Sequence, residues 1–137
     1  MLGRVIFRTA MATTTTSIQV QRVYEPASEK DGVRVLVDGL WPRGLSKPAA
    51  AVDLWLKDIG PSRALRQWFN RDPSRWAEFK ARYAAELDAL AERSPSVKAL
   101  AGAVRRGKVT LLFGARDTRH NVAVALHAYL MQRQLIV

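Results

Sequence analysis

The chain has 137 residues, of which 48% are hydrophobic and 25% charged, as is typical of one globular domain with its own core. It has no cysteine and only two histidines, which excludes disulfides and thiolate catalysis and argues against a histidine-rich metal site. The excess of 22 Lys and Arg over 12 Asp and Glu gives a net charge of +10. Such a charge favours an anionic small molecule or nucleic acid as partner, although a basic surface can also serve solubility alone.

Residues 1–16 differ in composition from the rest of the chain. "MLGRVIFRTAMATTTT" has two arginines, no acidic residue and a threonine-rich end, and its apolar run is too short for a secretory signal. A mitochondrial presequence is compatible with this composition. We favour a flexible leader or a mis-assigned start, since Met11 could itself be the initiator. A single domain is expected over residues 17–137. No apolar stretch is long enough to span a bilayer, and the lack of cysteine fits a cytoplasmic protein without a membrane partner.

Three segments have the pattern of β-strands. Residues 17–24 alternate in polarity, whereas 33–41 and 108–115 are nearly continuous apolar runs, typical of strands covered on both faces. The connection between the first two segments is short for a parallel crossover. The first strand is therefore expected either to be antiparallel to the second or to be separated from it within the sheet.

Helical patterns fill most of the chain between the second and third strands, and another follows the third. Residues 52–59 form a short amphipathic piece, Ser62 is a candidate N-cap for a helix over 61–69, and Asp72 with Pro73 marks the start of a longer helix. We interpret the aromatic and aliphatic stripe of this longer helix as core rather than as a base-stacking surface. Its residues are Trp76, Phe79, Tyr83, Leu87 and Leu90. Further helices are expected over 94–106 and over 118–133.

The order strand, strand, helices, strand, helix predicts a small α/β domain. We expect a short, mostly parallel sheet of about three or four strands, flanked by helices in Rossmann-like layers. Ligands of such sheets bind beyond the carboxyl ends of the strands. Two strand ends carry polar groups here, "DGLWPRGLSK" at 38–47 and "GARDTRHN" at 114–121. If the two strands are parallel neighbours, these segments converge.

We expect Arg43 and Arg116 to hold a phosphate or carboxylate, helped by the N–H groups of a helix beginning near Thr118. Asp38 and Asp117 are the candidate catalytic residues, as hydrogen-bond acceptors or proton carriers. The complete set of predicted ligand-binding residues is Arg22, Trp41, Arg43, Lys47, Arg116, Thr118 and Asn121. There is no glycine-rich phosphate loop, no metal-ligand set is predicted, and the cofactor, if any, stays unknown.

Each candidate also has a purely structural interpretation. Asp38 could accept hydrogen bonds from the turn at 42–44, and Asp117 could pair with a neighbouring arginine or cap the last helix. Trp41 could cover a core, and Asn121 could cap a helix locally. His120 could act as a general base or simply lie on the surface.

The same segments resemble the YeaO-like family, a branch of domain of unknown function 488. The resemblance covers about residues 18–131 and rests on "QRVYEPASEKDGVRVLVDGLWPRGLSK", "DLWLKDIGPSRALRQWF", "WAEFKARYAAEL" and "VTLLFGARDTRHNVAVAL". It implies a small cytoplasmic α/β protein whose biochemistry is not established. The matching positions are Arg22, Asp38, Trp41, Arg43, Lys57, Ser62, Arg66, Asp117 and Asn121. Gly39 stands where the family pattern has arginine, so one positive side chain of the pattern is absent.

These observations support two functions. The first is binding, with or without turnover, of a phosphate-bearing or other anionic small molecule at the strand ends. The alternative is a nucleic-acid-binding or regulatory module that uses the basic surface. The sequence assigns neither a reaction nor an oligomeric state.

Overall fold

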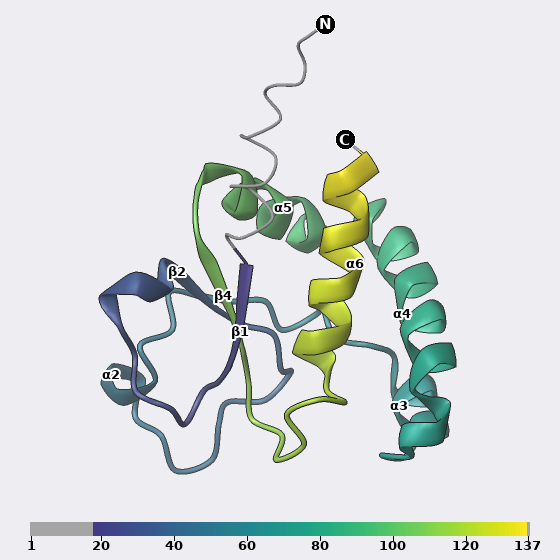
Figure 1. Cartoon of the computed structure of the whole chain (residues 1–137), viewed down its shortest axis with the longest axis horizontal. Helices are drawn as coiled ribbons and strands as arrows, with labels where there is room; N and C mark the ends of the chain where they lie inside the picture. The colour runs from purple at the N-terminus through teal and green to yellow at the C-terminus, as the bar shows by residue number, and fades with distance from the viewer. Residues whose placement is uncertain (1–17, 137) are drawn as a thin grey trace, which may run out of the picture.

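The computed structural model describes residues 18–136, so the expected leader at 1–16 lies outside the described residues. Its centre is a four-stranded sheet in the order β1-β4-β2-β3. Figure 1 labels β1, β4 and β2 of this sheet. The strands are β1 (Ile18–Arg22), β2 (Val33–Leu36), β3 (Leu54–Trp55) and β4 (Val109–Phe113), and every pair is parallel. The predicted α/β fold with a short parallel sheet is confirmed.

The last strand of the chain, β4, lies between β1 and β2. Arg22 is paired in register with Phe113, and Leu36 with Leu112. The alternative that the first strand is separated from the second is therefore confirmed, and the antiparallel alternative is wrong. Residues 23–32, with the short 3₁₀ helix η1 (Glu29–Asp31), return the chain to the start of β2. An extended residue spans about 3.3 Å, so this segment is long enough without a full helix.

The segment 52–59, predicted as part of the helical region, contains strand β3 instead. Asp53 N donates to Arg34 O at 2.8 Å and Leu56 N to Leu36 O at 3.0 Å, which extends the sheet beyond β2. The side chains alternate accordingly: Leu54 and Leu56 face the main core and Trp55 faces the opposite side. Over so few residues a two-residue period is easily mistaken for a helical one.

Four helices cover one face of the sheet. They are α3 (Arg63–Phe69), α4 (Trp76–Ala91), α5 (Ser96–Arg106) and α6 (Val122–Ile136). The main core joins them to alternate residues of β2 and β4, namely Val35, Val109, Leu111 and Phe113. The stripe of α4 is confirmed as core, since Phe79, Tyr83 and Leu87 are buried and its two end residues are partly buried.

The other face is covered by the short helix α2 (Lys47–Ala50) and the loops around it (Figure 1). A smaller second core there contains Leu36 and Leu112, with Trp41 and Trp55 packed against it. Both faces of β2 and β4 are therefore covered, as their continuous apolar runs predicted. Over residues 18–136, none of the helices is long and apolar enough to cross a membrane.

A buried polar group lies beside this second core, near the amino end of β2. Arg34 Nη1 donates to Asp31 Oδ2 at 2.6 Å, and both side chains are about 4% exposed. The same guanidinium donates to the carbonyl oxygens of Ala51 at 3.0 Å and Ala50 at 2.9 Å. The ion pair thus fixes α2 and η1 against the sheet.

The predicted helix boundaries hold in part. Ser62 Oγ accepts from Leu65 N at 3.1 Å and caps α3 as predicted. Asp72 caps the 3₁₀ turn η2 (Pro73–Arg75), and α4 begins only after that turn. The helix predicted from Thr118 begins at Val122, because Asn121 Oδ1 accepts from Val124 N at 2.9 Å and caps α6 there.

Candidate functional site

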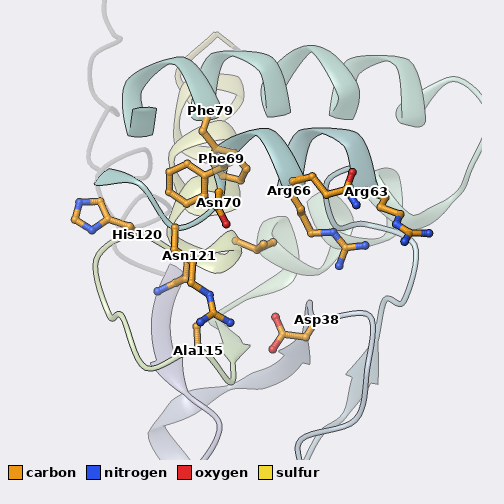
Figure 2. Close-up of a pocket in the computed structure, with 12 residues that line it drawn as sticks. Asp38, Arg63, Arg66, Phe69, Asn70, Phe79, Ala115, His120 and Asn121 are labelled. Atoms are coloured by element: carbon orange, nitrogen blue, oxygen red, sulfur yellow. The ribbon is translucent and has the colours of Figure 1, made fainter. Parts of the chain in front are cut away.

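A cavity of about 540 Å³ lies at the carboxyl ends of β2 and β4, beside the end of α3 (Figure 2). We call it the strand-end cavity. Its walls combine the apolar rings of Phe69 and Phe79 with the polar side chains of Asp38, Arg66 and Asn121. Both the location and the volume are typical of small-molecule sites in parallel α/β proteins.

Asp38 reaches the cavity from the end of β2. Its Oδ2 accepts from Gly114 N at 2.8 Å, so the carboxylate links the ends of β2 and β4. Trp55 Nε1 donates to Asp38 O at 2.8 Å and fixes the backbone. Burial raises the pKa of Asp38, and the hydrogen bond from Gly114 opposes that shift in part. Asp38 is thus a hydrogen-bond acceptor, but its donor is at the end of β4 and not in the turn at 42–44.

Three arginines line the strand-end cavity, and we call them the arginine rim: Arg63, Arg66 and Arg71. The first two are three residues apart on α3 and therefore share one face of that helix. Arg71 follows Asn70, and both have left-handed backbone angles, with φ of 57° and 46°, which turn the chain at the end of α3.

The guanidinium groups of the arginine rim form no ion pairs in the part of the chain that the structure describes. Within residues 18–133 no carboxylate lies at ion-pair distance from any of its guanidinium groups. Figure 2 shows the guanidinium of Arg66 and the carboxylate of Asp38 facing each other across the cavity. The rim is thus available for an external anion.

The loop between β4 and α6 forms another wall and is fixed by Asp117. Asp117 Oδ1 accepts from Arg119 N at 2.8 Å and from His120 N at 2.9 Å, and Oδ2 lies 3.0 Å from His120 Nδ1. These bonds, first of all the one from Arg119 N, lower the pKa of Asp117. Asn121 Nδ2 donates to Asp117 O at 2.9 Å. Asn121 thus caps α6 locally, as its structural interpretation predicted. Among the described residues, Asp117 neither pairs with an arginine side chain nor caps α6; its carboxylate instead fixes the loop through two backbone N–H groups and His120.

A second cavity of about 600 Å³ adjoins the first and is lined by Arg116 and Asp117. The two cavities share Arg71, Ala115 and His120. Of the predicted site residues, the strand-end cavity therefore contains Asp38 and Asn121, and its neighbour contains Arg116 and Asp117.

Three other predicted residues lie away from the strand-end cavity. Trp41 covers the second core, with its ring centroid 5.4 Å from that of Trp55, as its structural interpretation predicted. Arg43 is exposed and contributes its carbonyl oxygen to Tyr24 Oη at 2.8 Å. Lys47 begins α2 on the opposite face of the sheet. The cationic partners available to an anion in this cavity are thus the arginine rim and not Arg43.

The remaining two predicted residues belong to the loops around the strand ends. Arg22 donates from Nε to Ala115 O at 2.9 Å and from Nη2 to Gly114 O at 3.1 Å, and so supports the end of β4. Thr118 is exposed within the loop. Neither residue lines either cavity.

Two of the rim arginines, Arg63 and Arg71, were not among the predicted residues, and Arg66 entered only through the family resemblance. The spacing of Arg63 and Arg66 behind a serine cap places them together, but no local signal says which way α3 faces. Among the described residues no group of three or more His, Asp or Glu side chains is placed to hold a metal ion.

Comparison with known proteins supports the resemblance seen in the sequence. Residues 17–135 match a family described as the inactive DUF488-N3 subclade. The uncharacterized protein YeaO of Escherichia coli K12 is 42% identical over 114 residues, covering 83% of this chain and 96% of that protein. An uncharacterized protein of Mycobacterium tuberculosis H37Rv is 48% identical over 80 residues, covering 56% of this chain and 68% of that protein. No solved structure matches significantly. The chain therefore belongs to the DUF488 family, within the subclade described as inactive.

Proposed function

We propose that this protein binds a phosphate-bearing or otherwise anionic small molecule in the strand-end cavity. The observation that carries the proposal is the arginine rim, whose guanidinium groups line one cavity and have no carboxylate partner among the described residues. A guanidinium group binds a phosphate or carboxylate through two parallel hydrogen bonds. The apolar wall of Phe69 and Phe79 strengthens such contacts, since it excludes water from one side.

Binding without turnover agrees best with the polar groups around the cavity. Both carboxylate oxygens of Asp117 are engaged within its own loop, and His120 Nδ1 is held by the same carboxylate. Asp38 lines the cavity, but no nucleophile–base pair accompanies it among the hydrogen bonds of residues 18–133. The family description as inactive points the same way.

Loss of a rim arginine is expected to weaken ligand binding. A thermal-shift screen of nucleotides, sugar phosphates and dicarboxylates should give at least one stabilising ligand, because a ligand that binds only the folded state raises its stability. For that ligand, Arg66→Gln should raise the dissociation constant about tenfold or more, as expected for a lost charge-assisted hydrogen bond of roughly 1.5–3 kcal/mol. Isothermal titration calorimetry measures this change.

The matched control is Arg105→Gln. Arg105 is exposed in the last turn of α5, outside both cavities, and the substitution removes the same charge. The affinity of the Arg105→Gln variant for the same ligand should equal that of the wild type. A screen without any stabilising ligand, or equal weakening by both substitutions, would contradict the proposal. Equal weakening together with a steep dependence of nucleic-acid affinity on salt would instead support the alternative of diffuse binding to the basic surface.

A further inference from the structure

We propose that the ligand of the strand-end cavity is a phosphate ester that carries hydroxyl groups, with its phosphate on the arginine rim and a hydroxyl donating to Asp38. This inference rests on the proposed function and specifies its ligand. It starts from a mismatch in the cavity, which combines the cationic rim with one carboxylate.

Among the described residues, one carboxylate oxygen of Asp38 is without a hydrogen-bond donor. Oδ2 accepts from Gly114 N at 2.8 Å, whereas no donor within residues 18–133 lies at hydrogen-bond distance from Oδ1. The side chain lines the cavity and faces Arg66 across it (Figure 2). Burial also raises the pKa of this carboxyl, which reflects the cost of its charge in this position. A donor supplied by a ligand would reduce that cost.

The charge distribution selects the kind of donor. A simple anion on the arginine rim gains the attraction of the guanidinium groups but is repelled by Asp38. An ammonium group of a ligand, placed next to Asp38, would in turn be repelled by the guanidinium groups of the arginine rim. A hydroxyl group donates to Asp38 without adding charge, so a phosphate ester of a polyol satisfies both ends of the cavity.

The apolar wall of the cavity is compatible with two classes of such phosphate esters. The rings of Phe69 and Phe79 are stacked, with centroids 4.5 Å apart, and both line the cavity. Phe69, which is 8% exposed against 2% for Phe79, offers the larger part of this wall and can contact the C–H face of a sugar or the ring of a nucleobase. Sugar phosphates and nucleotides share the chemistry inferred here, and the experiment must separate them.

The experiment compares matched ligands by isothermal titration calorimetry. Ribose 5-phosphate is compared with tetrahydrofurfuryl phosphate, and AMP with 2′,3′-dideoxy-AMP, so that each pair differs mainly in its hydroxyl groups. In at least one pair the ligand with hydroxyl groups should bind the wild type about tenfold more tightly. The ligand without them leaves Oδ1 of Asp38 without a donor. If the preference is seen in the ribose pair, a sugar phosphate is sufficient for recognition. If it is seen only in the AMP pair, the ligand is a nucleotide.

The variant Asp38→Asn tests the role of the carboxylate. Its amide oxygen can still accept from Gly114 N, while its amide group presents donors to the cavity. The preference for hydroxyl groups should fall severalfold, because a hydroxyl can make only a neutral hydrogen bond with the amide in place of a charge-assisted one. The ligand without hydroxyl groups should bind more tightly than to the wild type, because the repulsion is removed. The control Asp88→Asn lies on α4 at an exposed ion pair with Arg133 and should keep the wild-type preference.

The outcomes separate this inference from the proposed function. Equal binding of both members of each pair to the wild type, or an unchanged preference in Asp38→Asn, would overturn the inference and leave the arginine rim as a general anion site. The comparison on the wild type remains decisive if Asp38→Asn does not fold. Binding of none of the four probes would overturn the inference, and the proposed function falls only if the wider anion screen also fails.

Discussion

Asp31→Ala is expected to lower the free energy of unfolding by roughly 3 kcal/mol, because it leaves the guanidinium of Arg34 buried without its counter-charge. Asp31 also accepts from Ser28 N at 2.9 Å and from Gln19 Nε2 at 3.3 Å, so the substitution removes support from η1 and β1 as well. Urea denaturation monitored by circular dichroism measures the change, provided that the slope with denaturant is unchanged.

Two controls distinguish a buried ion pair from a general loss of charge. Glu78→Ala breaks the exposed ion pair with Arg82 on α4 and should cost less than about 1 kcal/mol. Arg34→Met combined with Asp31→Ala should be less destabilising than the sum of the two single substitutions, since no unpaired charge remains. A cost for Asp31→Ala no larger than that of Glu78→Ala would contradict the prediction.

The ion pair between Asp31 and Arg34 also predicts the direction in which the free energy of unfolding changes at acid pH. Burial alone would raise the pKa of Asp31, but the hydrogen bonds from Ser28 and Arg34 outweigh it, and the net pKa lies below the ordinary value of 3.8. A lowered pKa contributes stability that is fully present above 3.8 and is lost as the pH falls through the value of the folded state. The difference in unfolding free energy between wild type and Asp31→Ala should therefore be constant near neutral pH and shrink below pH 3.8.

The sequence was sufficient for the parts of the fold that are decided locally. The continuous apolar runs of β2 and β4 predicted strands covered on both faces, and the cap at Ser62 and the stripe of α4 were predicted correctly. The position of β4 between β1 and β2 depends on pairing across the whole chain, so the sequence left it open. Strand β3 was missed because two residues are too few to show a period.

A cavity does lie at the strand ends where the sequence places the candidate site, but most of the residues that line it were not among those predicted. Strand ends in a parallel sheet are shared by many proteins, and Asp38 could be located from that rule alone. The arginine rim depends on how α3 packs over the sheet and on the left-handed turn at Asn70 and Arg71. These are tertiary features. Arg43 was assigned to the anion because it follows the same strand as Asp38, yet the intervening turn carries it away from the cavity.

Gly32→Ala is expected to destabilise the protein by at least about 2 kcal/mol, because an alanine cannot keep the backbone conformation or the space of this glycine. Gly32 has φ 65° and ψ −141°, a combination that is nearly confined to glycine. An added Cβ would lie 2.2 Å from the carbonyl oxygen of Lys108. That oxygen accepts from Val33 N at 3.0 Å, so its displacement also weakens the first link between β2 and β4. Thermal unfolding and urea denaturation measure the loss.

Gly39→Ala is the matched control, and it also tests the departure of this chain from the family pattern. A Cβ on Gly39 would meet only the carbonyl oxygen of Lys57, at 3.7 Å, and the residue is exposed, so the change in stability should stay within about 0.5 kcal/mol. The same space should admit Gly39→Arg, the residue of the family pattern, with a similarly small effect. Equal losses in Gly32→Ala and Gly39→Ala would contradict the steric argument. A folded Gly39→Arg would then show whether a guanidinium next to Asp38 raises the affinity for the probes that bind the arginine rim.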